Sequence, residues 1–175
     1  MLEFVQEHAE LHINVDLDKK VERLNDKKTK ITILQSFCET GSYLTLFEVG
    51  TGAGDTNLSN RRKYEQRMFG NVYDGFDEQR PRYGNLNIMA HIKGDREARD
   101  YGKSFLILKN HVRRRCTITS CDSINDCAVL GTLSHCAHVL YDHVLNTKNK
   151  KAFLEQVHCL AHKKTFPRNR FNAET

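Results

Sequence analysis

The sequence predicts a single α+β domain, because three β-favouring runs occupy the middle of the chain and helical patterns flank them. The runs cover residues 86–90, 103–109 and 115–120, and the second contains an unbroken apolar stretch at 105–108. Upstream, Asn57 or Ser59 can cap a helix that reaches Met68, and Gly70 stands where a glycine ends a helix. A chain of 175 residues is long enough for one domain, 1–175, with a full core.

The first 50 residues add further signals. A short strand is predicted over 11–15. A second is predicted over 43–49, where alternation places Tyr43, Thr45, Phe47 and Val49 on one face. The stretch 16–30 is highly charged and predicts a loop or an exposed helix. Residues 31–37 are apolar enough for either a helix or a strand, and both remain open.

The last third of the chain predicts helix. Four apolar residues there follow helical spacing: Leu133, Ala137, Leu140 and Val144. Asn125 or Asp126 can cap this helix, and Asn146 closes it. The stretch 152–160 is too short for periodicity to separate a strand from a short helix. The core is expected to span 12–160, and residues 166–175 to form a tail.

The charge pattern limits the classes of partner. The formal charge is +5, and basic residues gather at 61–63, 113–115 and 148–151. Solvated surfaces and functional patches explain these groups equally well. Aromatic residues are not interleaved with them, so nucleic acid is not expected as a partner.

Targeting signals also limit the classes of protein. No stretch is long and apolar enough to span a membrane, and acids stand near the N-terminus where a signal peptide needs bases. The expected location is a reducing cytosol, which includes that of a host cell after leaderless export. A monomer is expected.

Cysteine and histidine are frequent, but their spacing is irregular. The six cysteines include no C-x-x-C pair, which favours free thiols over a disulfide framework. Only Cys136 with His138, and Cys159 with His162, approach the ligand spacing of a zinc site. Buried thiols and surface histidines are the favoured explanation, so no metal site is predicted, and a zinc protein is the third alternative for function.

A glycine-rich loop and a central block could bind an anion. The loop G-T-G-A-G-D at 50–55 resembles a phosphate cradle, although a hairpin or tight turn explains it equally well. In the block from 80 to 123, Arg80 and Arg115 could hold a diphosphate, because guanidinium groups match phosphate oxygens. Asp122 or Glu155 could polarise a ribose hydroxyl. A structural salt bridge of Arg80 or Asp122 is an equally good explanation.

The central block resembles the signature of a family of mainly bacterial proteins catalogued as a domain of unknown function. The family pattern is close to R-P-x-Y-G-x-L-N, then [YF]-G-S-x-x-L-x-L, then H-V-x-x-R-T-T-x-x-x-G-D-S. This chain has R-P-R-Y-G-N-L-N at 80–87, Y-G-K-S-F-L-I-L at 101–108, H-V-R-R-R-C-T at 111–117 and C-D-S at 121–123. Further matches are F-E-V-G-T-G-A-G at 47–54, Y-E at 64–65, F-G-N-V-Y-D at 69–74 and Q-V-H-C at 156–159.

Members of that family include effectors that transfer ADP-ribose from NAD to a threonine of ubiquitin. The resemblance therefore implies an ADP-ribosyltransferase-like split β-sheet with flanking helices, and a mono-ADP-ribosyltransferase of the toxin or effector class. NAD would be the substrate, and ubiquitin or a similar host protein the acceptor. In such enzymes a strand arginine holds the NAD diphosphate, small hydroxyl residues shape the nicotinamide-ribose pocket, and an acid stabilises the cationic ribose.

Carried over by position, the resemblance predicts two sets of site residues. The NAD-binding set contains Arg80 for the diphosphate, the Tyr83-Gly84 turn, and Asn87, Ser104, Arg115, Thr117 and Thr119. The catalytic set contains Glu155, Asp122 and His158.

Two departures from the family pattern bear on activity. The glycine of G-D-S is Cys121 here, and the glutamate of the family's E-x-Q-x-H-G falls on Leu154, one residue before Glu155. On a strand, a one-residue slip turns a side chain to the opposite face, so a local bulge would have to bring Glu155 in. The alternative function is an inactive module that binds NAD, ADP-ribose or ubiquitin.

Overall fold

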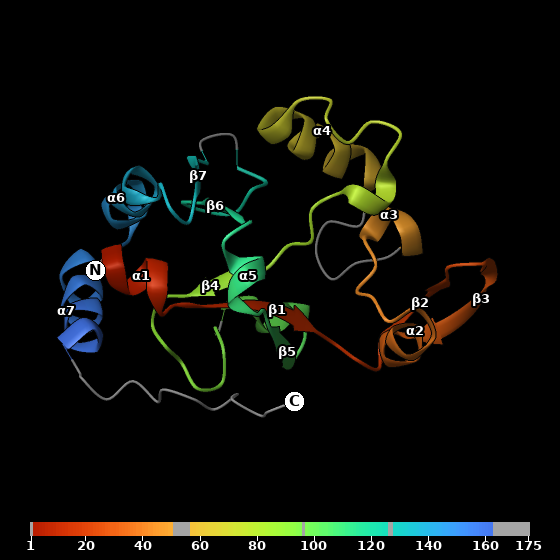
Figure 1. The fold of residues 1–175 in the computed structure, drawn as a ribbon, viewed down its shortest axis with the longest axis horizontal. Coiled ribbons are helices and arrows are strands. Elements are labelled where there is room, and N and C mark those ends of the chain that lie inside the picture. The colour runs from red at the N-terminus through yellow and green to blue at the C-terminus, as the bar shows by residue number, and fades with distance from the viewer. Residues whose placement is uncertain (1, 51–56, 96, 126–127, 163–175) are drawn as a thin grey trace. The chain divides into compact units, whose positions relative to one another are not determined.

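The computed structural model describes residues 2–50, 57–95, 97–125 and 128–162, and it has an α+β fold of helices and three small sheets (Figure 1). The chain divides into two compact units. Unit 1 contains the residues up to Glu10, Asn87–Ile92 and the chain from Lys109 onward. Unit 2 contains Leu11–Leu86 and Lys93–Leu108. None of the described helices is long and apolar enough to cross a membrane.

A three-stranded sheet, whose residues belong to unit 2 except for Glu10 and Asn87, has β1 (Glu10–Val15) in its centre, between β4 (Asn85–Asn87) and β5 (Ser104–Ile107). β1 runs antiparallel to β5, and every residue from 11 to 15 is buried, as expected for a central strand. The predicted strands over 11–15 and 103–109 are therefore confirmed. The strand predicted over 86–90 is shorter than expected and lies at 85–87.

A β-hairpin follows β1. β2 (Lys20–Arg23) pairs antiparallel with β3 (Asp26–Thr32), and it places Val21 opposite Ile31 in a small core with Val49. The prediction of a loop or exposed helix over 16–30 is therefore wrong. The sequence did not indicate the hairpin, because most of its side chains are charged and show no strand pattern.

Two helices begin at capping boxes. α2 (Ile33–Thr40) begins after Thr32, whose side chain and that of Gln35 each accept a hydrogen bond from the other residue's backbone NH. α3 (Leu46–Val49) begins in the same way at Thr45 and Glu48. The strand predicted over 43–49 is therefore wrong, since this local cap outweighs the alternating pattern.

α4 (Leu58–Phe69) confirms the helix predicted upstream of the central block. The Asn57 side chain accepts hydrogen bonds from the first turn, and the helix ends at Gly70. Two short 3-10 helices complete unit 2: η1 (Asp77–Gln79) and η2 (Glu97–Tyr101). The glycine-rich loop beyond Gly50 lies outside the described residues.

Unit 1 combines four helices with a two-stranded sheet in its described part. The helices are α1 (Leu2–Glu7), α5 (Asn110–Arg113), α6 (Ala137–Asn146) and α7 (Lys150–His162), and the strands are β6 (Thr117–Thr119) and β7 (Leu130–Thr132). β6 confirms the strand predicted over 115–120. The helix predicted from 125 or 126 starts only at Ala137, because 130–132 pairs with β6, and its end at Asn146 is confirmed. The stretch 152–160 is helical.

Arg113 joins α5 to α1 within unit 1. Its side chain is buried, and its guanidinium donates to the backbone carbonyls of Val5, Gln6 and Glu7 at 2.7–3.2 Å. The last carbonyls of a helix have no partner within the helix, and a cation is favourable beside them. Arg113 therefore caps the C-terminus of α1.

Candidate functional site

One of the most buried charged groups of unit 2 is the guanidinium of Arg80, which directly follows η1. Its Nη1 donates to Glu65 Oε2 at 2.6 Å, and its Nε donates to Asp77 Oδ1 at 2.8 Å. The side chains of Arg80 and Glu65 are only 3% and 2% exposed. A buried charge is tolerated only when it is paired and hydrogen-bonded, and both conditions hold here.

Aromatic rings complete the surroundings of the arginine. Arg80 Cζ lies 4.3 Å from the ring centroid of Phe47, on α3, and Arg62 Cζ lies 4.7 Å from the same centroid. Arg62 also pairs with Asp77 at 3.3 Å. Cations at this distance from a ring are attracted by its quadrupole. Three segments of unit 2 therefore converge on Arg80: α3, α4 and η1.

Tyr83 is held by the same carboxylate as Arg80. Its hydroxyl donates to Glu65 Oε1 at 3.1 Å, and the Arg61 guanidinium lies 4.3 Å from its ring centroid. Burial of the phenol, together with the negative charge of Glu65, raises the pKa of Tyr83 well above its usual value. The hydroxyl therefore remains a hydrogen-bond donor at neutral pH.

One nitrogen of Arg80 differs from the other two. Nη2 is buried and makes no hydrogen bond within the part of the chain that the structure describes. Its nearest charged partner is Asp74 Oδ1 at 3.7 Å, an ion-pair distance that is too long for a hydrogen bond. The Asp74 side chain is 65% exposed. Nη2 is therefore the donor of this site with unused capacity for an oxyanion.

The other predicted residues of unit 2 lie just before or at the start of the strands that flank β1. Gly84 precedes β4, and a Cβ atom at this position would stand 2.3 Å from the His12 carbonyl oxygen. Ser104 begins β5 opposite Val15 and is exposed. The structure thus gives Gly84 a packing role, and the contact between the Tyr83-Gly84 turn and NAD stays a prediction.

The NAD-binding residues predicted in unit 1 have local partners or lie on the surface. The buried Asn87 amide both donates to and accepts from the backbone of His91, and closes a loop in which Ala90 has a φ of 48°. Thr119 donates to the Cys121 carbonyl at 2.7 Å. The remaining two, Arg115 and Thr117, are exposed.

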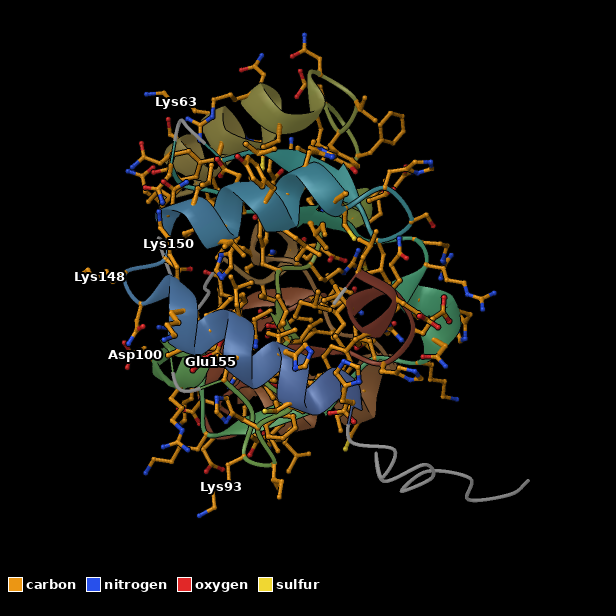
Figure 2. The ribbon with its side chains drawn as sticks, turned by 90° about the vertical axis from the view of Figure 1, so that its left-hand side faces the viewer. Lys63, Lys93, Asp100, Lys148, Lys150 and Glu155 are labelled. Carbon is orange, nitrogen blue, oxygen red and sulfur yellow. The ribbon has the colours of Figure 1, made fainter. Side chains whose placement is uncertain are left out.

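The predicted catalytic residues are all exposed and all lie in unit 1. The Asp122 carboxylate accepts a hydrogen bond from the Ile124 NH at 3.1 Å. Glu155 lies on α7, 65% exposed, with Lys151 Nζ at 3.9 Å (Figure 2). The His158 ring contacts the ring of His162, one helical turn further on, in a tilted arrangement. The bulged strand invoked to turn Glu155 inward is wrong, because this stretch is a helix.

Sequence reasoning missed the acidic partners of Arg80. No periodicity joins Glu65, Asp74 and Asp77 to an arginine up to 15 positions away. The available signal was the motif resemblance, since Tyr64-Glu65 and Tyr73-Asp74 each fall in a family motif. Among the described residues, no three His, Cys, Asp or Glu side chains gather in a way that could hold a metal ion.

Comparison with known proteins gives one finding. Residues 9–165 match a family model described as a protein of unknown function (DUF3626). No curated protein and no solved structure matches the chain.

Proposed function

Because the chain belongs to the DUF3626 family, we propose that it is an NAD-dependent mono-ADP-ribosyltransferase that modifies a protein side chain. The observation that carries the proposal is the ordered series of motifs from Phe47 to His158, which lies inside the matched region 9–165. The acceptor is a threonine of ubiquitin or of a similar host protein, by the resemblance set out above.

The surroundings of Arg80 support a diphosphate site. A guanidinium binds phosphate oxygens through two parallel NH groups, and Nη2 still has hydrogen-bonding capacity. Glu65 and Asp77 fix the other two nitrogens, so the side chain is preorganised. Such a site would bind NAD before any chemistry takes place.

The proposed reaction breaks one bond of NAD and forms another. The bond between the ribose anomeric carbon and the nicotinamide nitrogen breaks, and nicotinamide leaves with the electron pair. The acceptor hydroxyl oxygen then bonds to the anomeric carbon and releases its proton to a base. Positive charge develops on the ribose in the transition state, so a carboxylate fixed nearby is the main contribution expected from the protein.

Asp122 and Glu155 are the two proposed carboxylates, and their surroundings differ. Asp122 is held by a backbone NH, which restricts its position. Glu155 has only the exposed Lys151 as a partner among the described residues, and such surface pairs hold a side chain weakly. Asp122 is therefore the better preorganised of the two.

Incubation with NAD and ubiquitin, followed by mass spectrometry of ubiquitin, tests the proposal. The expected result is a mass increase of one ADP-ribose, located on a threonine. NAD binding without transfer or hydrolysis would instead support the inactive binding module. A chain that neither binds nor hydrolyses NAD contradicts both.

Substitution of the two carboxylates identifies the acid. Asp122→Asn keeps an oxygen that can accept from the Ile124 NH, so the turn should persist while the charge is lost. NAD hydrolysis should then fall about tenfold or more with little change in NAD affinity, as for the loss of an interaction made only in the transition state. Glu155→Gln is the matched comparison. Loss of turnover in Glu155→Gln alone would assign the role to Glu155, and equal activity in all forms would exclude both.

A further inference from the structure

We infer that Asp74 occupies the oxyanion site of Arg80 in the ligand-free protein, and that a phosphate-type anion binds by displacing it. This inference deepens the proposed function, and its assignment to NAD rests on that function. The site itself rests only on the contacts of Arg80, so it can be tested with a simple anion.

The first support is the unequal bonding of the three guanidinium nitrogens. Nε and Nη1 have carboxylate oxygens at 2.8 and 2.6 Å, whereas Nη2 has no hydrogen bond among the described residues. A buried donor without a hydrogen bond is unfavourable. An anion that accepted from Nη2 would remove this deficit.

The second support is the difference between Asp74 and the other two carboxylates. The Glu65 side chain is 2% exposed and Asp77 is 41% exposed, and both bond directly to Arg80. Asp74 is 65% exposed and lies 3.7 Å away. Only the Asp74 side of this pair is exposed, where water and salt screen its charge, and the long distance weakens the pair further. Asp74 is therefore the partner that an incoming anion can replace at the lowest cost.

The third support is the charge of the cluster. Three arginines, Arg61, Arg62 and Arg80, accompany three carboxylates, Glu65, Asp74 and Asp77. Withdrawal of Asp74 leaves one positive charge in excess, which an anion would neutralise. Arg61 is a second potential donor, because its Nε is also buried without a hydrogen bond among the described residues.

The segment that carries Asp74 has a backbone suited to such a movement. It lies between Gly70 and Gly75, whose φ angles are 65° and 85°. Both values fall in the left-handed region, which glycine adopts without steric cost. Residues 71, 72, 74, 75 and 76 are exposed, so little packing opposes a displacement of Asp74.

Titration calorimetry with inorganic pyrophosphate tests the inference on the full chain at fixed ionic strength. Asp74→Asn removes the competing charge and keeps the size of the side chain. Pyrophosphate should then bind about two- to fivefold more tightly, the change expected when a long ion pair with one exposed partner no longer competes. Asp100→Asn is the matched control, since it removes one exposed aspartate elsewhere in unit 2 (Figure 2).

Arg61→Gln should weaken pyrophosphate binding, and Lys63→Gln, which removes an exposed charge from the same helix, controls for the general loss of positive charge. Equal affinities for Asp74→Asn and Asp100→Asn would overturn the displacement. Failure of every form to bind pyrophosphate would overturn the site.

The outcome for NAD separates this inference from the proposed function. If Asp74→Asn binds pyrophosphate more tightly and no form binds or hydrolyses NAD, the oxyanion site stands and the transferase proposal fails. If NAD is hydrolysed equally by wild type and Asp74→Asn, and pyrophosphate affinity is unchanged, the transferase proposal stands and Asp74 has no part in it.

Discussion

Glu65 and Arg80 form a buried ion pair with an Nη1–Oε2 distance of 2.6 Å, and Glu65 also accepts a hydrogen bond from the Tyr83 hydroxyl. The pair joins the middle of α4 to the segment that leads into β4. An arginine that resembles a ligand-binding residue in the sequence is therefore also a structural centre of unit 2. We therefore expect substitutions of Arg80 to lower stability, in addition to weakening the anion binding proposed above.

The first prediction concerns this pair. Glu65→Gln removes the negative charge that neutralises the buried guanidinium of Arg80. The free energy of unfolding should therefore fall by about 3–5 kcal/mol. Glu39→Gln is the matched control, because the Arg23–Glu39 pair has the same 2.6 Å distance but about 40% exposure of each side chain. Urea unfolding should show a large loss for Glu65→Gln and little for Glu39→Gln. Equal losses would mean that burial of the pair has no energetic consequence.

The second prediction concerns close packing at Gly84. An alanine Cβ there would lie 2.3 Å from a backbone oxygen of β1, which cannot rotate away as a side chain can. Gly84→Ala should therefore cost about 1–3 kcal/mol of stability. Gly41→Ala is a useful contrast, since its φ of 66° is unfavourable but its surroundings are open. A loss of about 1 kcal/mol of stability is expected for Gly41→Ala. The prediction fails if Gly84→Ala unfolds at the wild-type urea concentration.

The third prediction is that the stability of the protein depends on pH through Asp77. Partial burial opposes ionisation of Asp77, but hydrogen bonds and charge from Arg80 and Arg62 outweigh it and lower its pKa. A carboxylate with a depressed folded-state pKa stabilises the protein above the unfolded-state pKa of about 3.9, and this contribution is lost as the pH falls through the folded-state value.

Wild type should accordingly lose stability as the pH falls from about 5 to about 3, and Asp77→Asn should lose less over the same interval. Urea midpoints at several pH values provide the measurement. Parallel curves for the two proteins would show that Asp77 does not contribute.

The fourth prediction concerns thiol reactivity. Burial raises the pKa of Cys116 and of Cys136, whereas Cys38 and Cys159 are exposed. Since the thiolate is the reactive form, alkylation of the native protein should modify Cys38 and Cys159 before the partly buried Cys116 and the buried Cys136. Cys136 should react at a comparable rate only in urea. Peptide mapping by mass spectrometry follows each site, and rapid native labelling of Cys136 would contradict its burial.

Much of the secondary structure could be predicted where a local signal was strong. Asn57 and Gly70 correctly bound α4, and the apolar runs correctly located β1 and β5. The prediction failed where two local signals competed. Thr45 and Glu48 form a capping box inside an alternating pattern, and the cap determines the structure. The charged hairpin of β2 and β3 was missed because most of its side chains face water.

The candidate site was less predictable, because its contacts are not local. Arg80 was correctly singled out by its motif, but its partners lie on α4, on η1 and before Gly75, at spacings that no periodicity encodes. Glu155 was predicted on the assumption of a strand, and a short stretch of mixed character could not exclude the helix that the structure has. Only three-dimensional contacts distinguish a held carboxylate from an exposed one.

The cap that Arg113 places on α1 has a consequence for the order of synthesis. The three carbonyls that it binds belong to residues 5–7, more than 100 positions earlier in the chain. Those residues leave the ribosome long before their partner is made, while β2 and β3 pair with each other across a short stretch of chain. α1 therefore acquires this cap only after Arg113 has been made, and until then its C-terminal carbonyls depend on water.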